Sequence, residues 1–120
     1  MDLARHREVL LQRPLDPGVV LLPRRFQQGL VGDVVRAARA LGERLEQAGA
    51  REPARELYRR ALELDPAGEE MYRRLMRSLI DDGMPAEALQ VYGRCRAMLA
   101  ATLGVGPSAE TESIVRALRR

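Results

Sequence analysis

The chain has 120 residues, of which 46% are hydrophobic, and its 20 basic and 17 acidic residues leave a net charge of +3. This length suits one domain, and so large an apolar fraction excludes a disordered tail. A single cysteine excludes an internal disulfide, suits a reducing cytoplasm, and together with a single histidine excludes a zinc or catalytic constellation built from these residue types. No apolar run approaches the roughly 20 residues of a membrane span, so no membrane association is expected.

The first part of the chain is predicted to hold one short helix followed by a break. Residues 2–12 carry enough apolar side chains on one side for a short helix. Two prolines and a glycine within residues 13–18 then stop it. The apolar strip over residues 19–22 is too short to assign to a helix or a strand.

A long helix is predicted over residues 23–47. Pro23 suits the first position of a helix, and Gly49 is a usual stop after its end. Between them, apolar residues recur at helical spacing. The predicted inward face consists of Val31, Val34, Val35, Ala38, Leu41, Leu45 and Ala48.

Three further helices are predicted over about 52–64, 69–82 and 85–102. A sixth is predicted after Ser108, which suits the N-cap of a helix over 108–120. This last helix should pack its apolar side, Ile114, Val115 and Leu118, against the preceding helix near Val91, Cys95 and Met98. Cys95 is interpreted as a buried core residue rather than a reactive thiol. Asp81 and Asp82 lie unfavourably at the end of their helix, and a polar helix end explains them better than a cation site does.

Residues 35–102 repeat themselves with a period of 34. In each unit a small residue is followed by an aromatic one and then by another small one. Small side chains let two helices approach closely, and the aromatic ring fills the groove that remains. The rhythm resembles the second helix of a tetratricopeptide repeat. Its positions are Ala54, Tyr58 and Ala61 in the first unit and Ala88, Tyr92 and Cys95 in the second.

The predicted fold class is all-α, with tetratricopeptide-like helical hairpin repeats, about six helices in total and flanking capping helices. We expect a single domain over residues 1–120, with repeat units 35–68 and 69–102 and a capping helix over 108–120. Folds of this kind hold partners rather than carry out chemistry.

The second half of the chain resembles one family more closely. The matching segments are residues 56–66 (ELYRRALELDP), 72–79 (YRRLMRSL), 86–92 (AEALQVY) and 103–111 (LGVGPSAET). They resemble the bacterial transcriptional activator domain, whose tail commonly has the pattern L-G-x-x-P-S-x-E-T. That module follows a winged-helix DNA-binding domain in regulators of the antibiotic-pathway type, and it occurs in large ATP-dependent regulators. The resemblance is strong over residues 43–118 and weaker over 13–42.

The resemblance implies a non-enzymatic, cytoplasmic regulatory module without a cofactor. Its expected partners are other domains of the regulator, RNA polymerase or a second copy of itself. DNA would be bound only through a separate winged-helix domain that is not in this chain. The chain itself would be an excised module or a short natural member of the family. The alternative is a free-standing peptide-binding adaptor, and the neighbouring domains in the parent gene would discriminate the two. A third possibility, direct DNA binding, predicts affinity that falls steeply with salt.

Partner contacts are expected on the first helices of the two hairpins, which line the concave side in this architecture. The candidates are Arg36, Arg39, Arg73 and Arg77, because a guanidinium can fork onto the carboxylates of an acidic partner. Charge reversal at Arg73 and Arg77 should then weaken partner binding and leave stability nearly unchanged. The alternative is a solvated, salt-bridged face, because each arginine cluster has acids one helical turn away.

The candidate self-association surface lies in the apolar stretch of residues 19–31, at Leu21, Leu22, Phe26 and Leu30. Contiguous exposed apolar surface usually marks an interface, and a symmetric homodimer is the commonest way to close one. The same stretch could equally fold back onto the long helix and bury itself.

Overall fold

The computed structural model describes residues 24–119, with side chains from residue 29 onward. The chain divides into two compact units, Met1–Asp33 and Val34–Arg120. Of the first unit, only the beginning of one helix is described. The helix predicted over residues 2–12, the break after it, and Leu21 and Leu22 lie outside the described residues. The single domain over residues 1–120 stays a prediction.

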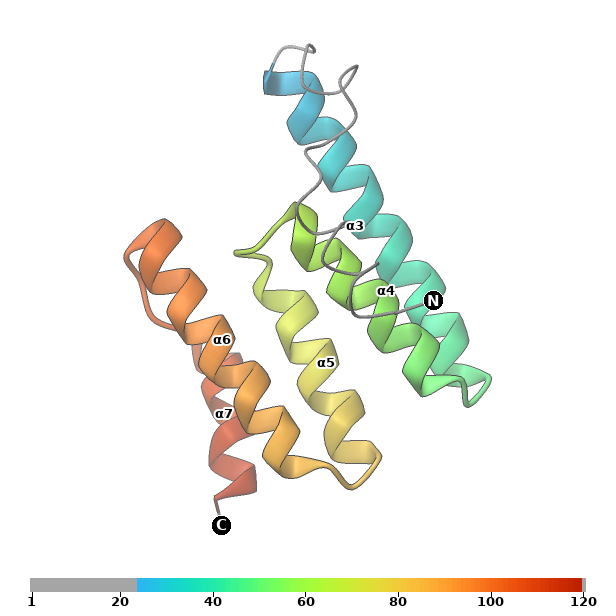
Figure 1. Ribbon diagram of the computed structural model, residues 1–120, viewed down its shortest axis with the longest axis vertical. Helices are drawn as coiled ribbons and strands as arrows, with labels where there is room; N and C mark the ends of the chain where they lie inside the picture. Colours follow the sequence, from blue (N-terminus) through green and yellow to red (C-terminus); the bar gives the residue numbers. More distant parts are fainter. Residues whose placement is uncertain (1–23, 120) are drawn as a thin grey trace, which may run out of the picture. The chain divides into compact units, whose positions relative to one another are not determined.

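Five helices and no strand make up the described part of the chain (Figure 1), which confirms the predicted all-α class. The sixth expected helix falls on residues that the structure does not describe. The bounds agree with the predicted ones to within one or two residues. The helices are α3 (Arg24–Gln47), α4 (Arg51–Leu64), α5 (Glu69–Asp81), α6 (Pro85–Leu103) and α7 (Ala109–Leu118).

The helix ends follow from a few residues with special backbone or side-chain properties. Gly49 and Gly83 follow α3 and α5 with φ of 79° and 72°, a left-handed conformation that glycine adopts without strain. Pro85 occupies the first turn of α6, where its missing N–H is not needed. Ser108 caps α7, and its side chain accepts the N–H of Thr111. Short turns between these ends fold the chain into the hairpins α3–α4 and α5–α6.

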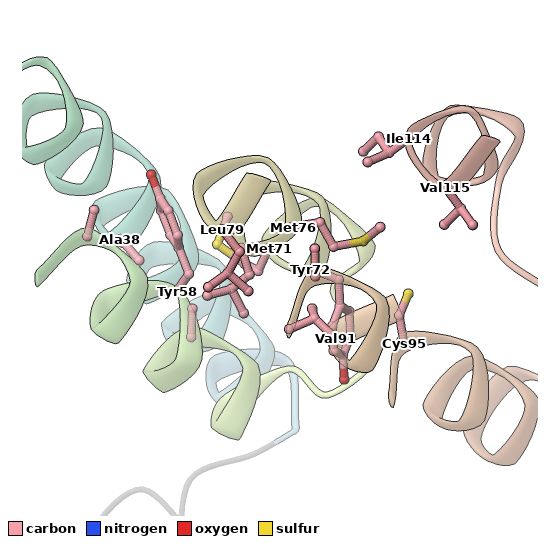
Figure 2. Close-up of a cluster of buried hydrophobic side chains, with 14 of the residues drawn as sticks. Ala38, Tyr58, Met71, Tyr72, Met76, Leu79, Val91, Cys95, Ile114 and Val115 are labelled. Carbon is pink, nitrogen blue, oxygen red and sulfur yellow. The ribbon is translucent and has the colours of Figure 1, made fainter. Parts of the chain in front are cut away.

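The core is centred on α5, which packs against α4, α6 and α7. Apolar side chains from all of these helices meet in one cluster (Figure 2). The predicted packing of α7 is confirmed, since Ile114 and Val115 are buried in the cluster that contains Val91 and Cys95. The buried hydrophobic residues are Ala38, Ala54, Tyr58, Ala61, Met71, Tyr72, Leu75, Met76, Leu79, Ala88, Val91, Cys95, Leu99, Ile114 and Val115.

Some sequence-based assignments to the core were too generous. Tyr92 is half-buried rather than buried, and its hydroxyl donates a hydrogen bond to Glu112 on α7 at 2.6 Å. On α3, Val34 and Leu41 are exposed by 42% and 49%, although both were predicted to face inward. Within the second unit, a narrow stripe around Ala38 and Gly42 is buried on this helix. A helix covered on one side buries only part of a wide apolar face.

Helices α3 and α4 meet at Gly42, where the ring of Tyr58 lies directly against the glycine. A Cβ added at Gly42 would meet Tyr58 Cε1 at 2.3 Å and its hydroxyl oxygen at 2.5 Å. Tyr58 has 0% of its surface exposed, so its ring has little room to move away. Glycine at position 42 is therefore required by the packing of the first hairpin.

We expect Gly42→Ala to destabilise the protein by about 1–3 kcal/mol, because the added methyl group overpacks a filled site. The matched control is Gly93→Ala on α6, where a Cβ meets nothing within 4 Å. There the same change should stabilise by up to about 1 kcal/mol, because alanine favours helix more than glycine does. Urea unfolding followed by circular dichroism measures both. Equal stability of the two variants would contradict the close packing at Gly42.

Candidate protein-binding groove

A groove of about 490 Å³ is bounded by α3, α4, α5 and α7. Helix α5 supplies most of its wall, because residues spaced three or four apart share one face of a helix. Positions 70, 73, 74, 77, 78 and 81 of α5 have this spacing. The lining residues are Glu46, Arg51, Glu70, Arg73, Arg74, Arg77, Ser78, Asp81 and Glu110.

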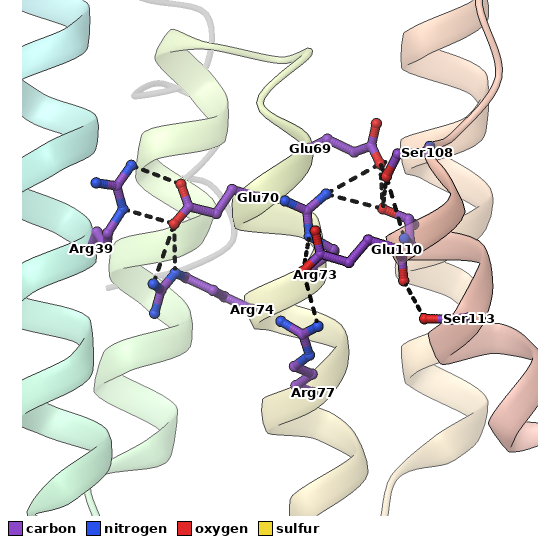
Figure 3. A network of polar contacts seen from close by, with 10 residues as sticks. Arg39, Glu69, Glu70, Arg73, Arg74, Arg77, Ser108, Glu110 and Ser113 are labelled. Carbon is purple, nitrogen blue, oxygen red and sulfur yellow. Dashed lines mark hydrogen bonds and ion pairs between the residues drawn. The ribbon is translucent and has the colours of Figure 1, made fainter.

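Ion pairs connect α3 to α5 across one side of the groove (Figure 3). Arg39 forks onto Glu70, with both N–O distances at 2.7 Å. Arg74 donates to Glu43 at 2.8 Å and to Glu70 at 3.2 Å. The hydrogen bond from Arg39 lowers the pKa of the Glu70 carboxyl below its ordinary value, against the opposing effect of burial. Glu70 is thus held ionised between two arginines.

A second set of contacts, the Glu69 latch, joins the first residue of α5 to the start of α7. One carboxylate oxygen of Glu69 accepts the backbone N–H of Ser108 at 2.9 Å and the hydroxyls of Ser108 and Thr111. Arg73 donates to the same oxygen at 3.2 Å. Burial raises the pKa of Glu69, but the hydrogen bonds from Ser108 and Thr111 outweigh this effect, and the pKa is lowered. The latch therefore needs the ionised carboxylate.

Arg73 and Arg77 also converge on Glu110 of α7, at 3.6 Å and 3.5 Å (Figure 3). Their side chains differ in access to solvent, with 15% of Arg73 and 53% of Arg77 exposed. Arg73 is consequently part of the α5–α7 contact, whereas Arg77 presents an accessible guanidinium.

A buried arginine, which the sequence analysis missed, lies behind the groove. Arg55 is only 3% exposed, and its guanidinium pairs with Asp82 at 2.7 Å, with Glu52 at 2.9 Å and with the Ser78 hydroxyl at 2.8 Å. Arg51 also binds Asp82, at 2.8 Å. Hydrogen bonds from Arg55 and then Arg51 lower the pKa of Asp82. Asp82 is therefore a favourable ion-pair partner, which corrects the expectation that it lies unfavourably at its helix end.

The predicted partner-binding arginines occupy different environments. Arg39 and Arg73 already bind acidic side chains of neighbouring helices, while Arg77 is exposed at the groove and Arg36 is exposed on α3 outside its lining. Among the predicted self-association residues, Leu30 is exposed, and the side chain of Phe26 is not among those described. Partner contact by any of these residues stays a prediction.

Two further properties of the described residues concern metal ligands and the single cysteine. Among them, no group of three or more His, Cys, Asp or Glu side chains could hold a metal ion. Burial raises the pKa of the Cys95 thiol to about 11, which suppresses the reactive thiolate. No helix in this part of the chain is long and apolar enough to cross a membrane.

The stacked hairpins, the capping helix and the charged groove define a tetratricopeptide-like helical protein. The family model of the bacterial transcriptional activator domain matches residues 23–119, and the chain belongs to this family of non-catalytic regulatory domains of bacterial transcriptional activators. The same comparisons find no matching curated protein and no matching solved structure.

We expect Glu69→Gln to destabilise the protein by about 1 kcal/mol at neutral pH, because the latch loses its charged acceptor. Folding lowers the pKa of Glu69 below its ordinary value of 4.5. The extra stability of the wild type over the variant is therefore fully present above pH 4.5, and it is lost as the pH falls through the lower pKa of the folded protein. Melting temperatures between about pH 3 and pH 7 measure this. The control is Glu63→Gln, an exposed acid of α4 that makes no ion pair among the described residues. A Glu69→Gln deficit that persists unchanged in acid would contradict the latch.

Proposed function

We propose that this chain is the protein-interaction module of a bacterial transcriptional regulator and that it docks partners through the groove between α3, α4, α5 and α7. The partner would be another domain of the regulator, RNA polymerase or a second copy of the chain. The observation that carries this proposal is a charged groove on the first helices of the hairpins, in a family of non-catalytic activator domains.

The charges around the groove favour a protein partner over DNA. A DNA-binding face needs cations that remain free to neutralise phosphates. Here Arg51, Arg73, Arg74 and Arg77 each pair with an acidic side chain. DNA contact would accordingly belong to a separate winged-helix domain of the same regulator.

A free-standing peptide-binding adaptor is the second candidate, because the same groove would serve it. The two proposals differ in what lies beside the domain in its parent gene. A winged-helix or ATPase neighbour supports the regulator, and an isolated reading frame supports the adaptor.

Charge reversal separates docking from folding. We expect Arg77→Glu to change the Kd for purified RNA polymerase at least about threefold with little change in melting temperature, because exposed ion pairs contribute little to stability. Arg73→Glu should lower the melting temperature, since it places a carboxylate beside Glu69 and Glu110. The sequence alone led us to expect that both reversals leave stability nearly unchanged, and the contacts of Arg73 are the reason for the different expectation here. Biolayer interferometry and thermal unfolding supply the two measurements.

The control for Arg77→Glu is Arg94→Glu, which changes the same charge at an exposed position of α6 outside the groove. If both variants bind RNA polymerase as the wild type does, the groove is not the surface that docks the polymerase.

Self-association is the other arm of the proposal, and exposed Leu30 on α3 supports it. The monomer mass is 13.4 kDa, and we expect light scattering on the eluting chain to give about twice that value. Leu30→Glu should restore the monomer mass. Leu103→Glu should leave the dimer intact, since Leu103 is exposed at the end of α6. A wild-type mass near 13.4 kDa throughout the micromolar range would exclude the dimer.

A further inference from the structure

The groove carries two carboxylates that have no counter-ion among the described residues. Each of its arginines is paired with an acidic side chain, as described above. Glu46 and Asp81 also line the groove, yet neither makes an ion pair with any described residue. The charged residues that line the groove are the arginines Arg51, Arg73, Arg74 and Arg77 and the acids Glu46, Glu70, Asp81 and Glu110.

These four arginines and four acids sum to zero, whereas the whole chain carries +3. Glu46 and Asp81 are the only charged residues of the lining without an ion pair among the described residues, so the uncompensated charge at their positions is negative. A local charge of this kind attracts ligands of the opposite sign and repels those of the same sign.

The positions of Glu46 and Asp81 make their lack of counter-ions more informative. Glu46 is in the last turn of α3, and Asp81 is the final residue of α5. The C-terminal end of a helix carries partial negative charge, so a carboxylate there is destabilising unless something offsets it. Asp82, the next residue, has Arg51 and Arg55 to offset its charge. Positions that conflict with local stability rules are expected at functional sites.

We propose that the groove binds a basic segment of a protein partner and that Glu46 and Asp81 anchor an arginine or lysine side chain of that segment. This inference rests on the proposed function and specifies the partner's chemistry. A partner cation would gain from both carboxylates and from the two helix ends without disrupting an internal ion pair. An acidic partner, as expected from the arginines alone, would have to displace Glu69, Glu70 or Glu110 from them.

The test uses the complete chain, labelled with ¹⁵N, and two synthetic decapeptides of alternating alanine with arginine or with glutamate. The arginine peptide should shift amide signals around Glu46 and Asp81 in low salt, and its affinity should fall as salt rises. The double variant Glu46→Gln/Asp81→Asn should bind it about tenfold more weakly, because two exposed charge pairs are lost.

The matched control, Glu63→Gln/Glu87→Gln, removes the same charge from exposed positions outside the groove and should bind the arginine peptide within about twofold of wild type. Thermal unfolding separates a binding role of the two carboxylates from a structural one. If they stabilised the fold, their removal would lower the melting temperature. Glu46→Gln/Asp81→Asn should melt at the wild-type temperature or above it, because unfavourable helix-end charges are removed.

The inference is overturned if the glutamate peptide binds more tightly, if neither peptide binds, or if the double variant binds the arginine peptide as well as the control does. Its failure can be told apart from failure of the proposed function. Without arginine-peptide binding, an Arg77-sensitive contact with RNA polymerase, or a dimer, would still support the regulatory module. Conversely, the arginine peptide could bind at Glu46 and Asp81 while the chain shows neither an Arg77-sensitive contact with RNA polymerase nor a dimer. That result would support the basic-segment site alone.

Discussion

The stacking of the two helical hairpins depends on how closely α3 and α4 approach each other. That distance is set where the ring of Tyr58 lies against Gly42. The ring is fully buried, and its hydroxyl finds no hydrogen-bond partner among the described residues. Burying a large aromatic surface can outweigh the cost of one unsatisfied hydroxyl. The guanidinium of Arg74 lies 5.9 Å from the ring centroid, within the range of a cation–π contact. Because Arg74 also binds Glu43 and Glu70, the packing of one ring helps to position the wall of the groove.

Charge then selects the register in which the hairpins stack. Arg39 and Glu43 lie one turn apart on α3, and they meet Glu70 and Arg74, which lie one turn apart on α5 in the opposite order of charge. A slip of one turn would bring Arg39 toward Arg74 or Glu43 toward Glu70. Exposed ion pairs add little energy of their own, but like charges in the wrong register are unfavourable. The apolar cluster therefore supplies most of the stability, while the charges distinguish one stacking arrangement from its neighbours.

The helices and the small–aromatic core positions were predictable because both depend on local patterns. Glycine and proline mark the helix ends, and the 34-residue period marks Ala54, Tyr58 and Cys95 as buried. The ionic contacts were not predictable in this way. The sequence suggested partners one turn away, whereas Arg39 pairs with a residue 31 positions away and Glu69 accepts from one 42 positions away. The sequence did contain a signal for these pairs, because residues of opposite charge recur 31 positions apart, which is three residues less than the 34-residue repeat. Nothing local indicates that Arg55 is buried or that Val34 and Leu41 are exposed.

The two ends of α5 differ in what they leave open to a partner. At Glu69 one carboxylate oxygen is engaged by α7, so a ligand there would compete with contacts that hold the capping helix in place. At Asp81 the fold leaves a carboxylate without an ion pair among the described residues, and Glu46 adds another on the same groove. Specificity is a difference between binding free energies, and displacing an internal ion pair subtracts from the gain of any new one. The sign of the groove's partner should therefore follow its uncompensated charge rather than its number of arginines.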